Sequence, residues 1–406
     1  MRSDFSIILA VSSFVIFLLA GGAAADLRED SLRAYAKKFG LIPASQTTST
    51  TSLAKSSVGR ELFESELLSL NGKISCRTCH LDEFSSADGL PNAIGVGGTG
   101  KGQERMKSGG RVVPRNTLPL WGRGSVGFHT LFWDGKVDGS SGQVVSQFGN
   151  SLPSSDPLVV AVHLPFVEIR EMVHNDLHVA EDYRNETVGS AKRIFDALTV
   201  RIRSNANLGG KVALAFDISV QDVTFSHIAE SIAEFIRDEF RIRSTRFHRF
   251  AFEGKSLKRD EIDGGILFYG KGRCALCHNG PLFSDLKFHA IPFPQAGFGK
   301  NGFGSDFGRY NVTFDDRDLY KFRTPPLFNV VSTGPYSHSG AVSDLAKAIR
   351  YHFDPLRHLN LNAMTARNRV DYYRRLSAWS GNNVSIPTLD DGEIQNLIAF
   401  LKTLSF

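Results

Sequence analysis

The sequence predicts a mainly α-helical protein built from two related domains. Three observations support this fold class: one short cysteine–histidine motif occurs once in each half of the chain, each copy follows a similar glycine-containing apolar run, and two segments carry apolar residues at helical spacing. The length of 406 residues, with 42% hydrophobic and 22% charged residues, is typical of a globular protein and is enough for two domains.

The chain begins with a segment that is typical of a cleavable export signal. An apolar run from Phe5 to Ala20 follows Arg2, and the small residues Ala23–Ala25 precede a charged stretch. The run is shorter than the roughly 20 apolar residues that span a bilayer. We therefore expect residues 1–25 to be a signal peptide and the mature protein, with no membrane span, to lie in the periplasm of a Gram-negative bacterium.

The four cysteines of the chain form two C-x-x-C-H motifs, Cys76-Arg-Thr-Cys79-His80 and Cys274-Ala-Leu-Cys277-His278. C-x-x-C-H is the attachment signature of c-type haem, because two thiols form thioethers with one porphyrin edge and the adjacent histidine binds the iron. Disulfides, a zinc site or a redox pair would each account for one C-x-x-C, but not for a histidine after both. The sequence therefore predicts two covalently bound haems c, with His80 and His278 as proximal ligands.

The runs that precede the two motifs indicate a duplicated module. They are Gly59-Arg-Glu-Leu-Phe-Glu and Gly265-Ile-Leu-Phe-Tyr-Gly. Between the motifs, apolar residues from Val223 to Phe240 repeat at helical spacing and predict a helix that closes the first domain. The basic stretch Arg241–Lys258 is interpreted as the linker. The predicted domains are residues 26–245 and 246–406.

Two further segments have local interpretations. Thr388-x-x-Asp391 resembles a capping box, and the apolar residues after it predict a C-terminal helix that packs on the second domain. The glycine-rich segment Gly95–Gly102 resembles a nucleotide-binding loop, but Gly102 stands where a magnesium-binding Ser or Thr belongs. We interpret that segment as a loop near the first haem.

Several motifs together resemble the bacterial di-haem cytochrome c peroxidases and their MauG-like relatives. Besides both C-x-x-C-H sequences, they are Phe132-Trp133-Asp134-Gly135-Lys136, Arg170-Glu171-Met172 and Thr333-Gly-Pro335-Tyr-Ser-His338-Ser-Gly340. The resemblance covers nearly all of the predicted mature chain. It implies two cytochrome c-like haem domains with long loops and few short strands, in which the N-terminal haem is peroxidatic and the C-terminal haem takes up electrons.

The resemblance assigns roles to residues near the N-terminal haem. Trp133 matches the tryptophan that relays electrons between the haems, and Glu171 matches the glutamate that moves a proton between the peroxide oxygens. Many family members carry a glutamine ten residues before that glutamate, where this chain has Ala161. Either His163 or Gln143 is left as its replacement.

The N-terminal iron is expected to be open. Many family members close the oxidised N-terminal haem with a distal histidine after the first motif, but no histidine lies between His80 and His129 here. We therefore expect a five-coordinate or water-bound iron that reacts without reductive activation, as in the MauG-like branch.

The second ligand of the C-terminal haem departs from the family pattern. Fourteen residues after His338, where peroxidases have methionine and MauG-like proteins have tyrosine, this chain has His352, with Tyr351 one place before it. Ligation by His352 would give a low-spin bis-histidine iron of lower potential than a His/Met site. Ligation by Tyr351 would give a MauG-like site. Position favours His352, and the alternative stays open.

The resemblance also implies an ion and partners. The family holds calcium between the haems through an asparagine side chain and two backbone carbonyls, which Asn116, Thr333 and Pro335 match. The implied partners are hydrogen peroxide and a small electron donor, either a c-type cytochrome or a cupredoxin, and family members often form homodimers. The formal net charge of +5 gives weak support for an acidic protein partner and none for nucleic acid.

The sequence therefore predicts a peroxidase that reduces hydrogen peroxide to water at the N-terminal haem, with electrons relayed from the C-terminal haem through Trp133. One alternative is MauG-like oxidation of side chains in a partner protein, which needs the same open haem. The other is a non-enzymatic electron carrier, which requires two six-coordinate irons.

Overall fold

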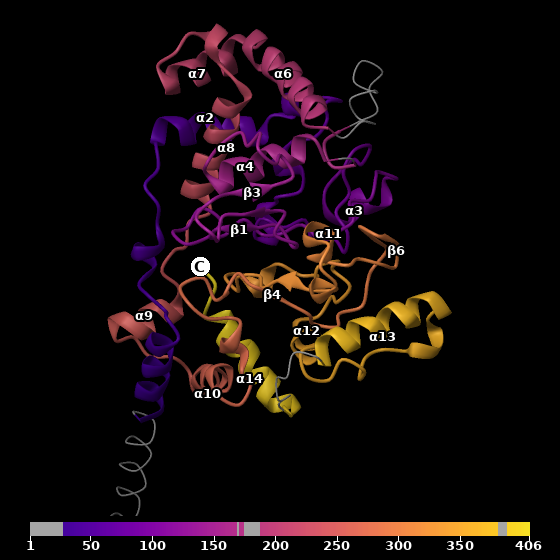
Figure 1. The fold of residues 1–406 in the computed structure, drawn as a ribbon. Coiled ribbons are helices and arrows are strands. Elements are labelled where there is room, and N and C mark those ends of the chain that lie inside the picture. Colours follow the sequence, from indigo (N-terminus) through magenta and orange to yellow (C-terminus); the bar gives the residue numbers. More distant parts are fainter. Residues whose placement is uncertain (1–26, 169, 174–186, 381–387) are drawn as a thin grey trace, which may run out of the picture.

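A computed structural model describes residues 27–168, 170–173, 187–380 and 388–406, so the predicted signal peptide lies outside the described residues. The described residues form two lobes, one above the other in Figure 1. The helices are α2 (Leu53–Glu64), α3 (Gly102–Lys107), α4 (Pro157–His163), α6 (Val188–Ser204), α7 (Ala206–Phe216), α8 (Phe225–Glu239), α9 (Arg246–Glu253), α10 (Arg259–Tyr269), α11 (Tyr310–Thr313), α12 (Leu345–Arg350), α13 (Ala366–Ser380) and α14 (Asp391–Lys402). The strands are β1 (Thr130–Leu131), β2 (Val137–Asp138), β3 (Val145–Ser146), β4 (Phe288–His289), β5 (Phe298–Gly299), β6 (Gly302–Phe303) and β7 (Phe322–Arg323).

The first lobe is built around the crossing of α2 and α8. Helix α8 begins with a capping box in which the Thr224 backbone N–H donates to His227 Nδ1 at 3.0 Å. Its apolar residues are buried along one face, as their helical spacing predicts. The crossing requires glycine in α2, because a Cβ on Gly59 would lie 1.9 Å from the Ser231 carbonyl oxygen.

The second lobe repeats this crossing with α10 and α14. A Cβ on Gly264 would lie 1.8 Å from the Asn396 carbonyl oxygen. In both lobes the glycine-bearing helix leads into a C-x-x-C-H motif, as a duplicated module requires. The predicted cap of α14 at Thr388 is wrong: the cap is Asp390, whose carboxylate accepts the Glu393 backbone N–H at 2.8 Å. A carboxylate there both caps the helix and complements its dipole.

The interpretation of residues 241–258 as a linker is also wrong in its central part. Helix α9 occupies it, and the rings of Phe247 and Phe250 are fully buried. The Phe247 ring lies 4.9 Å from that of Phe400 in α14. Arg246 is exposed and Arg249 is half-buried, whereas His248 is buried beside the phenylalanines, so the basic composition indicates an amphipathic helix.

The N-terminal residues 27–38 are helical and pack on the second lobe. Leu32 is fully buried there against Gly265, and the Tyr35 and Tyr269 rings stack at 6.5 Å. In Figure 1 this indigo segment lies beside α9 and α10 and then runs up to α2. The chain therefore starts on the second lobe, crosses to the first and returns at α9, an order that the sequence does not indicate.

Each strand is only two residues long. Strands β1, β2 and β3 form an antiparallel sheet in that order, with Leu131 opposite Val137. Strand β4 pairs with β7, and β5 pairs with β6 as a tight hairpin. The mainly helical fold class is thus confirmed. Among the described residues, no helix is both long and apolar enough to cross a membrane.

Candidate haem sites

A pocket in the first lobe contains the first C-x-x-C-H motif, and it is called the first pocket below. Cys76, Cys79 and His80 line it together with Trp133 and Glu171, so the structure brings these five predicted residues together. Most of the remaining wall is apolar. A largely apolar pocket with a few directed polar groups suits a porphyrin. Its apolar residues include Phe63, Leu118, Leu120, Leu131, Phe132, Leu158, Val162, Phe166, Ile232 and Ile236.

The imidazole of His80 has the form that an axial ligand needs. Its Nδ1 lies 2.8 Å from the Ser86 carbonyl oxygen, which can only accept, so Nδ1 carries the proton and Nε2 is left to bind iron. Burial lowers the pKa of His80 to about 4 and keeps the imidazole neutral.

Glu171 is a carboxyl group with a raised pKa. Burial, followed by repulsion from Glu168, raises its pKa to about 7, although nearby lysines oppose the shift. The residue before it, Arg170, has a positive φ of 76°, and its carbonyl accepts the Val96 backbone N–H at 3.0 Å. A Cβ on Gly95 would lie 1.8 Å from that carbonyl oxygen. The glycine-rich segment therefore supports the backbone of the Glu171 loop, where a side chain would not fit.

Trp133 lies where the two lobes meet. Its Nε1–H donates to the Asn116 carbonyl at 3.0 Å, and its own carbonyl accepts the Arg323 backbone N–H at 2.8 Å. Asn116 belongs to the first lobe, whereas Arg323 belongs to β7 of the second. Because hydrogen bonds from both lobes hold it, the tryptophan is fixed between them.

A buried ion network supports this junction. Arg115 donates to both oxygens of Asp306 at 2.9 Å and to Asp134 Oδ2 at 2.6 Å. Burial acts against ionisation of both carboxyls, but Arg115 overcomes it and holds their pKa values below the usual range. Asp306 comes from the second lobe and Asp134 follows Trp133 directly. Because Arg115 and Asp306 are 191 residues apart, the sequence pattern does not predict this ion network.

The charged side chains near Glu171, which are Lys136, Glu168 and Lys300, were also not predicted from the sequence. Lys136 Nζ lies 2.8 Å from Glu168 Oε2, and Lys300 Nζ lies 4.0 Å from Glu168 Oε1. All four side chains line the first pocket. Lys136 ends the F-W-D-G-K motif and Glu168 precedes Glu171 by one helical turn in sequence, so both had a local signal. Lys300 had none, because it comes from the second lobe.

Neither replacement for the family glutamine reaches the first pocket. Gln143 is exposed in the turn between β2 and β3, which pair as an antiparallel hairpin. His163 is buried at the end of α4, where its Nδ1 bonds the Val159 carbonyl at 2.8 Å and its ring lies 5.2 Å from Phe225. Ala161 itself lines the pocket. The structure therefore does not support a distal role for Gln143 or His163.

The second C-x-x-C-H motif faces a second histidine. His278 Nδ1 donates to the Phe283 carbonyl at 3.0 Å, and His352 Nδ1 donates to the Ala348 carbonyl at 2.9 Å, so both Nε2 atoms are left to bind iron. Burial, followed by the proximity of His352, lowers the pKa of His278 to about 4. The structure thus brings these two imidazoles together.

Tyr351 and His352 share one neighbour, because the Phe293 ring lies 5.6 Å from the Tyr351 ring and 5.5 Å from the His352 ring. The Tyr351 side chain is otherwise buried in a small apolar cluster with Val342 and Ala348. Burial raises the pKa of its phenol, which opposes formation of the phenolate that binds ferric iron. Of the two alternatives, the structure favours His352.

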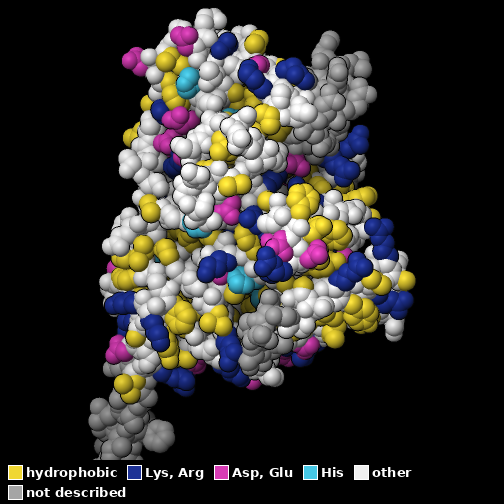
Figure 2. Space-filling view, viewed as in Figure 1, with side chains coloured by type: hydrophobic (Ala, Val, Ile, Leu, Met, Phe, Trp, Pro, Cys, Tyr) yellow, Lys and Arg dark blue, Asp and Glu magenta, His cyan; other side chains and the backbone are white. Residues whose placement is uncertain are grey.

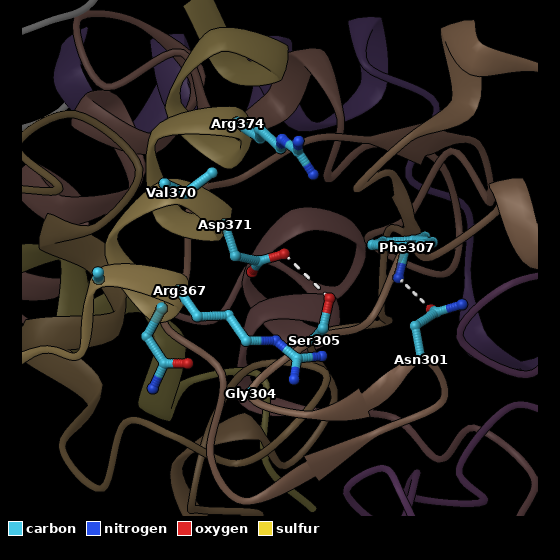
Figure 3. Close-up of a pocket in the computed structure, with 10 residues that line it drawn as sticks. Asn301, Gly304, Ser305, Phe307, Arg367, Val370, Asp371 and Arg374 are labelled. Atoms are coloured by element: carbon cyan, nitrogen blue, oxygen red, sulfur yellow. Dashed lines mark hydrogen bonds between the residues drawn. The ribbon is translucent and has the colours of Figure 1, made fainter.

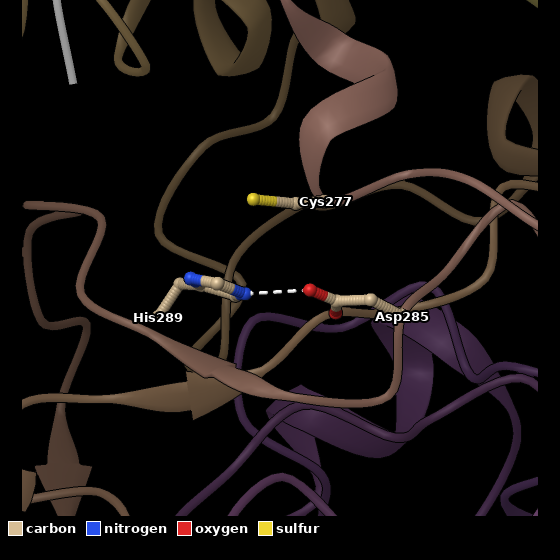
Figure 4. Close-up of side chains that lie close together, drawn as sticks. All are labelled: Cys277, Asp285 and His289. Carbon is tan, nitrogen blue, oxygen red and sulfur yellow. Dashed lines mark hydrogen bonds and ion pairs between the residues drawn. The ribbon is translucent and has the colours of Figure 1, made fainter. Parts of the chain in front are cut away.

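An ion pair adjoins the second motif (Figure 4). His289 Nε2 lies 2.8 Å from Asp285 Oδ2, and hydrogen bonds with Asp285 and Cys277 raise the pKa of His289 to about 9. The three side chains are close enough to hold a metal ion. However, a thioether bond to haem uses the sulfur of Cys277, so the ion pair is more simply a charged neighbour of the haem attachment.

The asparagine predicted to bind calcium is oriented suitably for it. Asn116 Nδ2 donates to the Leu90 carbonyl at 2.7 Å, which leaves the side-chain oxygen as the atom that can bind a cation. The Asn116 backbone N–H donates to the His338 carbonyl at 2.9 Å, so Asn116 adjoins the loop that contains Thr333 and Pro335. An oxygen donor set of this kind fits calcium.

Two buried arginine side chains bear on whether the structure suits haem, which carries two anionic propionate groups. Arg323 is fully buried, and its Nη2 has no hydrogen-bond partner among the described residues. Arg123 lines the first pocket, and both guanidinium groups lie over the ring of Phe128, at 5.2 Å for Arg123 and 5.3 Å for Arg323. A buried guanidinium without an anion is costly, by several kcal/mol or more. Haem propionates are anions that would satisfy both side chains.

Comparison with known proteins agrees with this site. Residues 53–256 match the family model of the di-haem cytochrome c peroxidases. The chain is 24% identical over 375 residues to cytochrome-c peroxidase IdrP1 of Denitromonas iodatirespirans, covering 86% of this chain and 81% of that protein. It is 26% identical over 341 residues to the methylamine utilization protein MauG of Methylorubrum extorquens, covering 82% and 78% respectively.

The fold is shared with a solved structure. A MauG-like protein associated with microbial copper homeostasis superposes with a TM-score of 0.63 at 24% identity, over 90% of this chain and 92% of that one. The family match spans half of the chain and includes the first C-x-x-C-H motif, Trp133 and Glu171. The chain therefore belongs to the di-haem cytochrome c peroxidase family, and it is an oxidoreductase of the kind that carries two c-type haems.

Proposed function

We propose that the protein reduces hydrogen peroxide to water at the N-terminal haem, with electrons that enter at the C-terminal haem. The observation that carries this proposal is the first pocket, where a half-buried glutamic acid with a pKa of about 7 accompanies the C-x-x-C-H motif. His80 is the one histidine among the described residues that line it. Cys76, Cys79 and His80 would hold a haem there, and that haem would supply the redox-active iron that reacts with peroxide.

Glu171 is the proton carrier of the proposed reaction. A group with a pKa near the working pH both accepts and returns a proton efficiently. Glu171 takes the proton from the near oxygen of peroxide and returns it to the far oxygen as the bond between them breaks. With two electrons and two protons in total, hydrogen peroxide then gives two molecules of water.

Trp133 connects this chemistry to the second lobe. We propose that electrons pass through its indole, whose Nε1–H bonds the Asn116 carbonyl of the first lobe while the Trp133 backbone carbonyl bonds the second lobe. At the C-terminal haem, His278 and His352 would both bind the iron, and two imidazole ligands favour a low-spin site of low potential. The calcium ion, held by Asn116 with Thr333 and Pro335, would stiffen the same junction.

The electron donor is proposed to be a small redox protein in the periplasm. Figure 2 shows Lys and Arg side chains on both lobes, with Asp and Glu side chains between them. The formal net charge of +5 favours encounter with an acidic cytochrome or cupredoxin. Export rests on the sequence of residues 1–25 and is tested by N-terminal sequencing of the mature protein.

Two measurements test the proposed function. Low-temperature EPR of the oxidised protein should give one high-spin ferric signal and one low-spin signal. Reduced small cytochrome should then be oxidised steadily when peroxide is added. Two low-spin signals without turnover would contradict the proposal and indicate an electron carrier.

The MauG-like alternative is supported by the similarity to MauG and by the same pocket. It makes a different prediction in the same assay. If peroxide oxidises side chains of a partner protein while turnover with reduced cytochrome stays negligible, the protein modifies proteins instead of removing peroxide. Mass spectrometry of candidate partners after peroxide treatment distinguishes the two functions.

A further inference from the structure

The β5–β6 hairpin is fixed to the second lobe on one side. The side chain of Asn301 accepts the Phe307 backbone N–H at 2.7 Å and donates to Asn311 at 2.8 Å. Ser305 donates to Asp371 of α13 at 3.0 Å. Figure 3 shows these groups around a surface pocket between the hairpin and α13. The turn of the hairpin is therefore held by its own lobe.

On its other side the hairpin reaches the first pocket. Lys300, in the turn, lines that pocket together with Lys136, Glu168 and Glu171 of the first lobe. Its ammonium group lies 4.0 Å from one oxygen of Glu168, whose other oxygen binds Lys136 at 2.8 Å. A single carboxylate thus lies between two ammonium groups from different lobes.

The charges of this cluster do not balance when Glu171 carries its proton. Two ammonium groups then face one carboxylate, and repulsion by Lys136 lowers the pKa of Lys300. Two arginines also line the pocket: Arg115 is neutralised by its own pairs with Asp134 and Asp306, and Arg123, over the Phe128 ring, would be neutralised by a haem propionate. A surplus positive charge is left beside Glu171, in surroundings with little water to screen it.

We propose that Lys300 is a positioning residue of the first pocket: with Lys136 it supplies a surplus positive charge that draws small anions to the site beside Glu171. In the proposed reaction, which this inference deepens, the same charge stabilises peroxide after its proton has passed to Glu171. The second lobe thereby supplies both electrons and part of the electrostatic field at the reacting atoms.

The pocket charge also affects the protonation of Glu171. The groups that face Glu171 are Glu168 on its own segment, Lys136 after β1, Lys300 on the hairpin, and the two cysteines of the motif. Positive charges favour the carboxylate, whereas Glu168 opposes it. Loss of Lys300 should raise the pKa of Glu171, and loss of the Glu168 charge should lower it.

The test compares the variants Lys300→Gln, Lys300→Arg and Glu168→Gln as oxidised holoproteins titrated with azide, a small anion that binds open ferric haem. We expect about tenfold weaker azide binding in Lys300→Gln, near recovery in Lys300→Arg, and tighter binding in Glu168→Gln. Lys107→Gln removes the same charge from an exposed site on α3 and should bind azide like the wild type.

The pH dependence of peroxide reduction gives the second readout. Its acid limb should move to higher pH in Lys300→Gln and to lower pH in Glu168→Gln. If Lys300 and Glu168 have only a structural role, Lys300→Gln and Glu168→Gln should change azide affinity and the acid limb in the same direction, and that result would overturn the inference. Wild-type azide affinity in Lys300→Gln would overturn it as well. Lys300→Met is used if Lys300→Gln fails to load haem. A wild type that neither binds azide nor reduces peroxide contradicts the proposed function itself.

Discussion

Replacing Glu171 with glutamine is the most direct perturbation of the proposed chemistry. Glutamine keeps the size and hydrogen-bonding capacity of the side chain but does not take up a proton. General acid–base catalysis contributes about 10²–10⁴-fold, so we expect kcat/KM for peroxide to fall roughly a thousandfold, or about 4 kcal/mol. The haem attachment should be unaffected, because Cys76, Cys79 and His80 are unchanged.

The pH profile separates this role from a general loss of structure. With a pKa of about 7, Glu171 is half ionised near neutral pH, so the wild-type rate should rise through pH 7 as the carboxylate forms. Stopped-flow reaction of the protein with peroxide from pH 5.5 to 8.5 measures this limb, which Glu171→Gln should lack. Glu253→Gln, an exposed change on α9, serves as the control. The reasoning is refuted if Glu171→Gln keeps the wild-type rate, or if it is slow but retains the limb near pH 7.

Four further changes test other parts of the two sites. His352→Ala should remove the low-spin EPR signal of the C-terminal haem, whereas Tyr351→Phe should leave it unchanged; the opposite result would assign the ligand to the tyrosine. Arg323→Gln should lower the reduction potential of the adjoining haem in a spectroelectrochemical titration, because a propionate loses its cation, and an unchanged potential would contradict that pairing. Trp133→Phe should slow electron transfer between the haems while both haems stay bound, as followed by rapid-scan spectroscopy; an unaltered rate would exclude the relay. Asn116→Ala should reduce the calcium content measured by atomic emission, and equal content in both proteins would count against the predicted ligand.

The sequence predicted those parts of the fold that depend on local pattern. The face of α8 and the duplication of the module were predicted, because apolar spacing and a repeated motif can be recognised within short stretches of sequence. The crossing of α2 with α8, and of α10 with α14, was not predicted. The capping of α14 and the nature of α9 were misjudged. Thr388 and Asp390 are both of a residue type that caps helices, and only the structure shows that Asp390 caps α14. In α9 arginine alternates with phenylalanine, so the segment has a basic composition although it is an amphipathic helix.

The candidate site divides in the same way. The C-x-x-C-H motifs have their chemistry within five consecutive residues, so haem attachment could be predicted without a structure. The choice between His352 and Tyr351 could not, because adjacent residues on a helix end point to different sides. Gln143 and His163 failed as distal groups for a related reason: spacing along the chain did not reveal which face of α4, or of the hairpin after Trp133, turns to the pocket.

By itself, the sequence predicted two haem attachments with their proximal histidines, and a glutamate and a tryptophan in family motifs. Only the tertiary structure decided which charges surround Glu171 and what holds Trp133. Across the junction of the two lobes, Arg115 pairs with Asp306, which is 191 residues away in the sequence. Glu168 of the first lobe lies between Lys136 of its own lobe and Lys300 of the second. Electrostatic interactions depend on distance in space and on burial, neither of which residue order specifies when the chain crosses between lobes.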